Sequence, residues 1–345
     1  RLVASGVADH GLTAGPGCDP LMPSRRSLAA AFAAIYLFWG TTFLALRYAV
    51  AEVPPLLTIA IRCGAGAFII FGWLAARGRL EPFTRQQWFV AGGAGLLLFL
   101  GGHSILAWAE MEVPSGQAAL LLTAIPSWLV LLEAIRLRRM PPGRVLAGLI
   151  VGTVGVALLA GGGSGAGSLE RGALVLAALL WAAGSLFARH SARPASAAQA
   201  TAMQLAAGGV IVLLASVGTG ELARWDAGAT SARAAGSIVF LVLGGTVAGF
   251  GAYTWLLRVT SAAAVGTYAF VNPIIAVLLA WAVGDESPSV LTGVAALLVL
   301  SAVFLISLRV PAGRLLPGSF LRSGKRKLLI PARSRLVPDP GTDCT

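Results

Sequence analysis

Long apolar segments, separated by short polar joints, follow one another along most of this sequence. Between residues 28 and 308 we count about ten of them, each close to the roughly 20 residues with which an α-helix crosses a bilayer. We expect them at 28–48, 55–76, 87–109, 115–136, 143–161, 170–189, 198–217, 236–258, 262–283 and 288–308. Because the joints are short, neighbouring helices should be antiparallel and adjacent. The pattern predicts an all-α membrane protein with about ten transmembrane helices.

A set of landmark residues occurs twice along the chain. The pairs that share one spacing are Gly102 with Gly249, Trp108 with Trp255, Pro126 with Pro273, and Pro141 with Pro288. At a slightly shorter spacing the pairs are Trp39 with Trp181, Arg47 with Arg189, Arg62 with Gln204, and Gly66 with Gly208. The first five spans therefore repeat as the last five. Because five is odd, the second copy should be inverted, and two inverted five-helix repeats are typical of transporters.

This organisation divides the chain into five parts. They are an N-terminal tail (1–27), the first five-helix repeat (28–161), a Gly-rich linker (162–169), the second repeat (170–308) and a basic C-terminal tail (309–345). Basic residues gather in the two tails and in every second joint, whereas the third and ninth joints carry acids. By the positive-inside rule both termini should be cytoplasmic.

Composition narrows the class of protein further. Hydrophobic residues make up 57% of the chain and charged residues only 12%, against about 25% in soluble proteins. The net charge of +12 is spread over joints and tails, so we expect a lipid bilayer as the surroundings and no nucleic acid as a partner. The three cysteines, Cys18, Cys63 and Cys344, have no metal or disulfide spacing. We expect no metal and no cofactor.

Two ionisable residues within the spans are candidates for function. Arg62 lies inside the second span, where a charge costs roughly 2.5–3.5 kcal/mol or more unless it faces a wet cavity or a partner. It is either a packing residue that bonds neighbouring carbonyl groups or an anchor for an anionic solute. His103, near the outer end of the third span, is either a hydrogen-bonded packing residue or a proton relay.

Aromatic and polar residues in the spans complete the candidate solute site. The expected substrate-binding residues are Trp39, Arg62, His103, Trp108, Gln204, Tyr253, Tyr268 and Asn272. Trp108 and Trp255 are close to span ends, where tryptophan also belongs to the interfacial belt. Pro126 and Pro273 should each break a helix by freeing a backbone carbonyl one turn earlier, as at many transporter sites.

Small residues should allow some of the spans to approach closely. Gly148, Gly152 and Gly155 form such a seam in the fifth span. The seam serves either packing within the fold or association into a homodimer. The sequence does not decide between packing within the fold and a homodimer.

Several stretches resemble the EamA-type members of the drug/metabolite transporter superfamily. They are FWGTTFLALRYAVAEVPPLLTIAIRCGAGA, AWAEMEVPSGQAALLLTAIPSW and its echo AFVNPIIAVLLAWAVGDESPS. The resemblance implies ten helices in two inverted repeats, a central cavity, and export of small metabolites or drugs across a bacterial inner membrane. One departure concerns an acid that is common after the ninth span. It is present as Glu286, but the matching position of the first repeat carries Arg139.

The sequence thus favours an exporter of small organic solutes, amino-acid-like or aromatic, that works by alternating access. Two alternatives remain, a membrane sensor or assembly subunit that transports nothing, and an intramembrane enzyme. The second needs a paired acid and base or a metal cluster within the bilayer. We therefore expect that the protein is not an enzyme.

Overall fold

The structure is a computed structural model that describes residues 24–161, 167–191, 194, 196–260, 265, 268–284, 286–287 and 289–307. The predicted C-terminal tail, most of the predicted N-terminal tail and most of the predicted linker lie outside these residues, so their boundaries stay predictions. Within the described residues the chain is helical, as the sequence predicted.

The helices of the first half follow the predicted spans closely. Their bounds are α1 Arg25–Val50, α2 Pro55–Ala76, α3 Arg85–Gly95, the π-helical segment η1 Leu96–Ser104, α4 Ile105–Ala109, α5 Ser115–Leu122, α6 Ala124–Leu137 and α7 Gly143–Gly161. The run α3–η1–α4 forms one span, and α5–α6 forms the next. The bundle has two ends, which we call the Arg25 end and the Val50 end after the first and last residues of α1.

The second half repeats this arrangement with one short excursion. Its elements are α8 Ser168–His190, α9 Ala197–Gly218, α10 Glu221–Arg224, the 3₁₀ turn η2 Ala227–Ala229, α11 Ala232–Phe240, the π-helical segment η3 Leu241–Ala248, α12 Gly249–Val259, α14 Tyr268–Ala282 and α15 Val290–Ser307. Eight helices in the described part of the chain are long and apolar enough to cross a membrane, and two shorter apolar ones correspond to the last two predicted spans. The prediction of about ten transmembrane helices is confirmed.

Local sequence signals set where several helices begin. The Ser24 side chain accepts a hydrogen bond from the backbone N–H of Ser27 at the start of α1. Thr84 and Gln87 form a reciprocal capping box at the start of α3. Pro55 occupies the first position of α2, where its missing N–H costs nothing.

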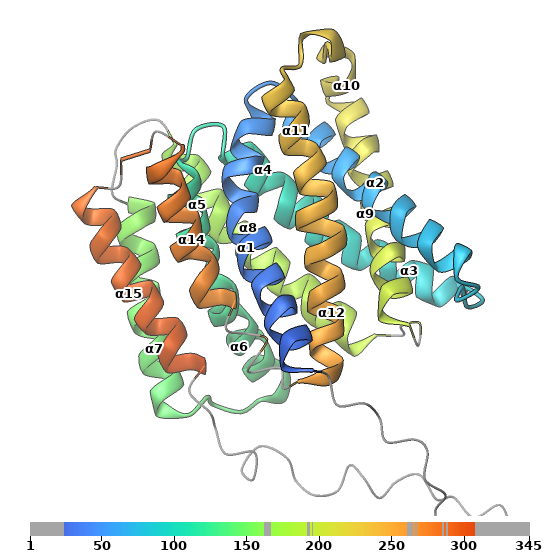
Figure 1. Ribbon diagram of the computed structural model, residues 1–345. Coiled ribbons are helices and arrows are strands. Elements are labelled where there is room, and N and C mark those ends of the chain that lie inside the picture. The colour runs from blue at the N-terminus through green and yellow to red at the C-terminus, as the bar shows by residue number, and fades with distance from the viewer. Residues whose placement is uncertain are drawn as a thin grey trace, which may run out of the picture. The chain divides into compact units, whose positions relative to one another are not determined.

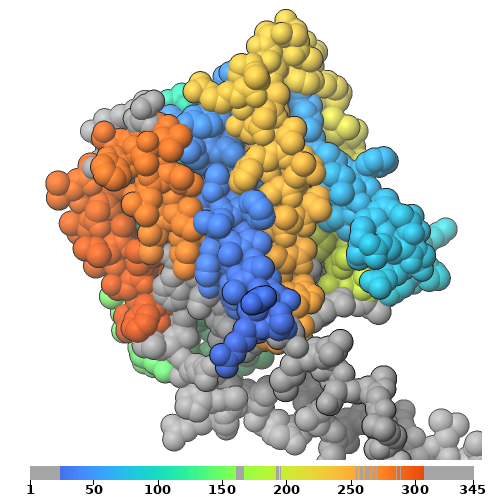
Figure 2. Space-filling view, in the orientation of Figure 1, coloured from blue at the N-terminus to red at the C-terminus, as the bar shows by residue number. Residues whose placement is uncertain are grey.

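Helices from the two halves pack against one another throughout the bundle. Helix α2 packs against α9, α7 against α15, and α1 against α14, α11 and α12. Figure 1 shows α1 between α14 on one side and α11–α12 on the other, and Figure 2 shows that α1 reaches the surface of this face. The two copies are therefore interleaved as one unit around α1.

The glycine seam of α7 faces α15. A Cβ atom on Gly148 would lie 2.8 Å from Cγ1 of Ile306, and one on Gly155 would lie 2.8 Å from Cγ2 of Val299. Such distances are too short for any real contact, so the two backbones approach as closely as they do because glycine stands at these positions. The seam serves packing within the fold, whereas the homodimer stays a prediction.

The outward faces of the helices are apolar. Phe68, Phe89, Ile150, Leu214 and Leu297 each leave 66% or more of their surface exposed. Exposed large side chains in this number would aggregate in water but are suited to contact with lipid.

The third and eighth spans share a feature that the sequence did not predict. Each contains a π-helical segment in its middle, η1 in the first repeat and η3 in the second. Ser104 donates its hydroxyl hydrogen to the carbonyl oxygen of Phe99 at 2.9 Å, and Thr246 donates to Leu241 at the same distance. In both segments the acceptor lies five positions earlier, which is the spacing of a π turn.

Candidate functional site

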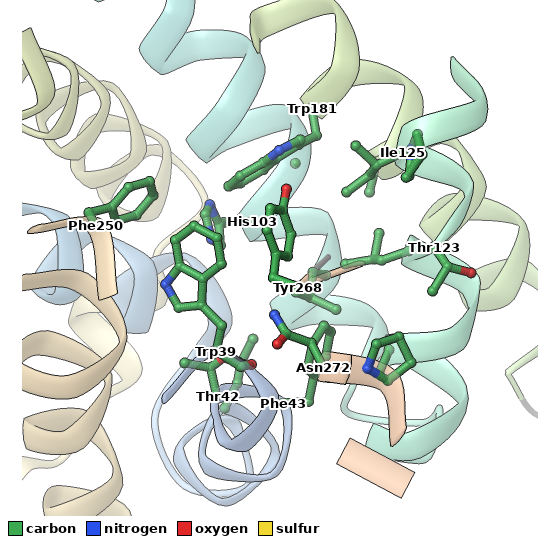
Figure 3. A pocket seen from close by; sticks show the side chains of 18 of the residues that line it. Trp39, Thr42, Phe43, His103, Thr123, Ile125, Trp181, Phe250, Tyr268 and Asn272 are labelled. Carbon is green, nitrogen blue, oxygen red and sulfur yellow. Dashed lines mark hydrogen bonds between the residues drawn. The ribbon is translucent and has the colours of Figure 1, made fainter. Parts of the chain in front are cut away.

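A cavity lies in the middle of the bundle, between helices of both repeats (Figure 3). Its free space is about 150 Å³, roughly tenfold what a single water molecule requires. The space can therefore hold a small organic group. Its wall is formed by Trp39, Thr42, Phe43, Leu46, Arg62, Gly102, His103, Leu106, Ala119, Leu122, Thr123, Ile125, Pro126, Leu129, Ala177, Trp181, Phe250, Tyr268, Asn272 and Pro273.

Trp39 of α1 is the centre of an aromatic cluster in this wall. Its ring meets Phe250 at 5.4 Å and Tyr268 at 5.0 Å between centroids, both edge to face. Its Nε1–H donates a hydrogen bond of 2.9 Å to the carbonyl oxygen of Gly245 in η3. The indole is therefore held in one orientation, and Figure 3 shows it and Tyr268 projecting into the same space.

Arg62 of α2 brings a buried guanidinium to the cavity wall. Its Nε–H donates to Oγ1 of Thr246 at 2.8 Å. In the part of the chain that the structure describes, its two terminal amino groups have no hydrogen-bonding partner. Its hydrogen bond goes to a hydroxyl group of the other repeat instead of a backbone carbonyl, and Arg62 also lines the cavity. Both the packing role and the role as a solute anchor stay predictions.

Two further polar atoms at this wall lack partners among the described residues. They are Nδ1 of His103 and Oδ1 of Asn272, both fully shielded from solvent. The His103 ring stacks on Phe99 with an interplanar angle of 11° and meets the edge of Trp181 at 4.5 Å. Because an orphaned buried polar atom is costly, these two atoms indicate a place where a polar ligand or water completes the hydrogen bonding.

The two predicted helix breaks both lie at the cavity. The fourth span is broken at Thr123, which separates α5 from α6 three residues before Pro126. Pro273 stands inside α14, in its second turn, without ending the helix. Missing backbone donors at both prolines free carbonyl groups close to the cavity.

Five of the eight predicted solute-site residues line this cavity: Trp39, Arg62, His103, Tyr268 and Asn272. Tyr253 lies behind them, with its ring 5.3 Å from that of Trp39 and 6.1 Å from that of Tyr268. Whether any of them binds a solute stays a prediction.

The placement of Trp108 and Gln204 in the cavity wall is wrong. Trp108 is 38% exposed and borders a separate hollow with Pro55, Leu56 and Glu221. Gln204 is not among the residues of the cavity wall, and its backbone carbonyl oxygen is close to Gly95 of α3.

The repeat itself points to residues that the sequence analysis missed. Trp181 is the repeat partner of Trp39, and Phe250 is the partner of His103, and all four line the cavity. Asn272 and Pro273 likewise stand at the spacing of Ile125 and Pro126, which also line it. Equivalent positions of the two copies thus face one space, as they must if the cavity lies on the axis that relates the halves.

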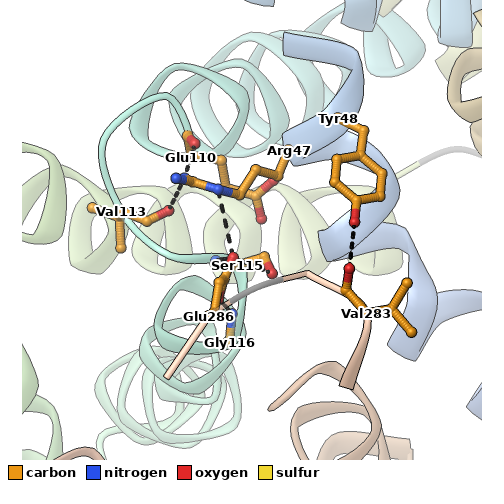
Figure 4. A network of polar contacts seen from close by, with 8 residues as sticks. All are labelled: Arg47, Tyr48, Glu110, Val113, Ser115, Gly116, Val283 and Glu286. Carbon is orange, nitrogen blue, oxygen red and sulfur yellow. Dashed lines mark hydrogen bonds and ion pairs between the residues drawn. The ribbon is translucent and has the colours of Figure 1, made fainter. Parts of the chain in front are cut away.

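A polar network lies at the Val50 end of the bundle (Figure 4). Nη1 of Arg47 donates to the carbonyl oxygens of Glu110 at 2.6 Å and Val113 at 2.9 Å, and Nε lies 3.5 Å from Oε1 of Glu286. The Glu286 carboxylate also accepts hydrogen bonds from Ser115 and from the N–H of Gly116, at the first turn of α5. We call these contacts the Val50-end network, and it ties α1 to the loops before α5 and after α14.

Comparison with known proteins decides the family. The model of the EamA-like transporter family matches residues 27–161 and again residues 172–308. The chain belongs to this family. The resemblance drawn from the sequence is confirmed, and the EamA-like protein is a membrane transporter built from two copies of one unit.

Relatives agree with this assignment. The EamA-like chain is 31% identical over 286 residues to YedA of Escherichia coli K12, named an uncharacterized inner membrane transporter, covering 81% of this chain and 90% of YedA. It is 23% identical over 279 residues to the uncharacterized transporter YoaV of Bacillus subtilis, covering 79% of this chain and 93% of YoaV. A solved structure, described only as that of a protein, matches with a TM-score of 0.55 at 21% identity, over 82% of this chain and 98% of that one. That likeness concerns the fold alone.

Proposed function

We propose that the protein exports small organic solutes that carry a carboxylate and an apolar or aromatic body, such as amino-acid-like compounds, by alternating access. The observation that carries the proposal is the cavity. Unpaired donors of Arg62 and the aromatic side chains of Trp39, Trp181, Phe250 and Tyr268 line the same cavity. A guanidinium binds a carboxylate in a fork, and aromatic faces hold an apolar body.

The remaining polar groups suit the other end of such a solute. Oδ1 of Asn272 is an unpaired acceptor and therefore a partner for an ammonium or amide N–H. The tryptophan and tyrosine faces also attract a cation. The site thus offers a donor for the acid and acceptors for the amine of one small molecule.

We further propose that the Val50 end faces away from the cytoplasm of the cell that carries the protein in its inner membrane. Basic residues between the end of α2 and the first residue of α3, Arg77, Arg79 and Arg85, lie at the opposite end of the bundle. With this orientation the Val50-end network closes the outer side of the cavity. Export is the direction that the family resemblance implies.

The test is counterflow into liposomes that contain the purified protein, with a mixed pool of labelled amino acids and nucleobases. We expect accelerated exchange of carboxylate-bearing members of the pool. Arg62→Gln should lower that exchange at least about tenfold, because a bidentate ionic contact is lost. Gln204→Ala is the matched control, since Gln204 is the repeat partner of Arg62 and lies away from the cavity.

Three outcomes would contradict the proposal. Exchange that is equal for the wild type and Arg62→Gln would remove the anchor role of Arg62. Exchange restricted to uncharged nucleobases would overturn the solute class. If the folded protein exchanged nothing in this pool or in a second pool of amphipathic drugs, transport of such solutes itself would fail. Direction is tested separately, by solute retention in cells with and without the protein.

A further inference from the structure

Glu110 is a buried acid that does not line the cavity. It follows directly on α4, and none of its surface is exposed. Both oxygens of its carboxyl group are shielded from solvent and have no hydrogen-bonding partner among the described residues. An ionised carboxylate in that position would be left without compensation, which proteins avoid by binding a proton or a cation.

Charged groups reach Glu110 from several elements. Helix α4 packs against α1, α2, η1 and α8. Arg47 of α1, Arg62 of α2 and Glu286, from the segment after α14, act on the carboxyl group. His103 is in η1, and Glu170 and Arg171 stand in the first turn of α8.

The nearest cation is already engaged by other acceptors. Arg47 donates to the backbone oxygen of Glu110, and its ion pair is with Glu286 instead of the Glu110 carboxyl group. Glu110 therefore stands beside the Val50-end network without contributing its side chain to it (Figure 4). Burial raises the pKa of the Glu110 carboxyl group well above its ordinary value, against the opposing effect of Arg47.

We propose that Glu110 is a proton-binding site whose occupancy holds the Val50 end of the transporter closed. The proposal rests on the transporter function proposed above and names the ion that regulates its cavity. In the closed arrangement the proton sits on a carboxyl oxygen of Glu110, and Arg47 remains with Glu286. On opening, that proton passes to water at the Val50 end.

Loss of the proton changes the partner of Arg47. A Glu110 carboxylate has a full negative charge beside a guanidinium that already bonds its backbone oxygen, so it competes with Glu286 for Arg47. When Arg47 leaves Glu286, α1 loses its ion pair with the segment after α14. Among the described residues it keeps the hydrogen bond from the Tyr48 hydroxyl to the carbonyl oxygen of Val283. Proton release and opening are thus linked, and each favours the other.

The sign of the pH effect follows from this linkage. The closed state binds the proton more tightly than the open state, in which water reaches the carboxyl group. The closed state is therefore fully favoured below the ordinary pKa of a glutamic acid and loses this advantage as the pH rises through the raised pKa. A single proton changes the ratio of open to closed by at most about tenfold per pH unit.

The experiment measures the distance across the Val50 end, with no solute present. Cys18, Cys63 and Cys344 are replaced by alanine, and Ala51→Cys and Val290→Cys carry spin labels at two exposed positions outside the network. Distances are recorded in lipid nanodiscs between pH 5 and pH 9. We expect a short distance at low pH and a growing population at a longer distance as the pH rises.

Variants assign the effect to one residue. Glu110→Gln copies the protonated form, so it should stay at the short distance at every pH. Glu112→Gln is the matched control, since Glu112 is an exposed acid in the same loop, and it should follow the wild type. Loss of the pH response in His103→Gln but not in Glu110→Gln would assign the titration to the histidine and overturn the proposal. Circular dichroism and gel filtration show that each variant is folded.

A pH response that persists in Glu110→Gln, or a wild type with no pH response, would overturn the proposal. The result is independent of counterflow, because no solute takes part. A protein that opens with pH but exchanges nothing would contradict the proposed solutes and leave the proton site standing. A protein that exchanges solutes without this pH response would support the proposed solutes and overturn the proton site.

Discussion

The guanidinium of Arg62 in the first repeat is hydrogen-bonded to the Thr246 hydroxyl in the second, with 2.8 Å between Nε and Oγ1. The Thr246 hydroxyl in turn donates a hydrogen bond to the carbonyl oxygen of Leu241 in η3. The hydroxyl therefore both accepts and donates a hydrogen bond, and it holds the buried guanidinium of Arg62 against the π-helical segment η3. This contact sets the position from which the guanidinium meets the cavity.

Thr246→Val keeps the shape of this side chain but removes the oxygen. We expect solute affinity to fall about three- to tenfold, because Arg62 loses the contact that orients it, and the free energy of unfolding to fall by about 1 kcal/mol. The half-saturating concentration in counterflow and thermal unfolding in detergent measure the two effects. Thr246→Ser should behave as the wild type, and an unchanged affinity in Thr246→Val would show that the contact does not orient Arg62.

Gly249→Ala should disturb the aromatic wall. A Cβ atom at this position would lie 2.8 Å from Cδ1 of Trp39 and still closer to its Nε1, so the indole must move and lose its bond to Gly245. Overpacking of this kind costs about 1–3 kcal/mol. We expect solute exchange to fall about tenfold or more. Gly236→Ala in the same span meets no atom within 4 Å and should leave exchange unchanged.

The Val50-end network should not tolerate an exchange of its charges. Arg47→Gln and Glu286→Gln each remove charge-assisted hydrogen bonds, and each should lower the free energy of unfolding by about 1–3 kcal/mol. In the combined Arg47→Glu and Glu286→Arg variant the ion pair can form again, but an arginine cannot accept the hydrogen bonds of Ser115 and Gly116. The swapped protein should therefore stay destabilised in thermal unfolding. Recovery to the wild-type value would mean that the ion pair alone matters.

Two glycine substitutions should have opposite signs. Gly155→Ala places a Cβ atom against Val299 at the seam between α7 and α15, and we expect a loss of about 1–3 kcal/mol in unfolding. Gly172→Ala stands at an exposed position of α8 where a Cβ meets nothing within 4 Å, and helix propensity predicts a gain of up to about 1 kcal/mol. Thermal unfolding in one detergent compares them. A gain in the free energy of unfolding for both variants would show that the seam can accommodate a Cβ atom at Gly155.

The spans and the repeat could be read from the sequence because the bilayer and the gene duplication leave long-range patterns. The rotation of each helix could not. A span that is apolar all round has no strong periodicity to show which face meets the cavity. Trp108 follows His103 by five residues, which turns it by about 140° around an α-helix, and the π segment before it shifts the phase again. The place of Trp181 in the cavity wall could have been predicted from the sequence, because the repeat pairs it with Trp39.

The residues of the Val50-end network illustrate a second limit. Arg47 and Glu286 are far apart in the sequence, and their pairing depends on how α1 and α14 meet. The sequence placed Glu110 and Glu286 only in acidic joints. Their burial and their different partners are properties of the packed bundle.

The π-helical segments determine what the deletion of a single residue would do to this chain. Each holds more residues per turn than an α-helix, so each copy of the unit contains a surplus residue at its midpoint. Removing one residue from η1 would let the helix close as a regular α-helix, with its capped start at Thr84 undisturbed. Because the wide turns take up the surplus residue, the side chains beyond η1 would keep roughly their present direction after the deletion. The side chains within η1, His103 included, would change position, so the span would remain a membrane crossing with a different cavity wall.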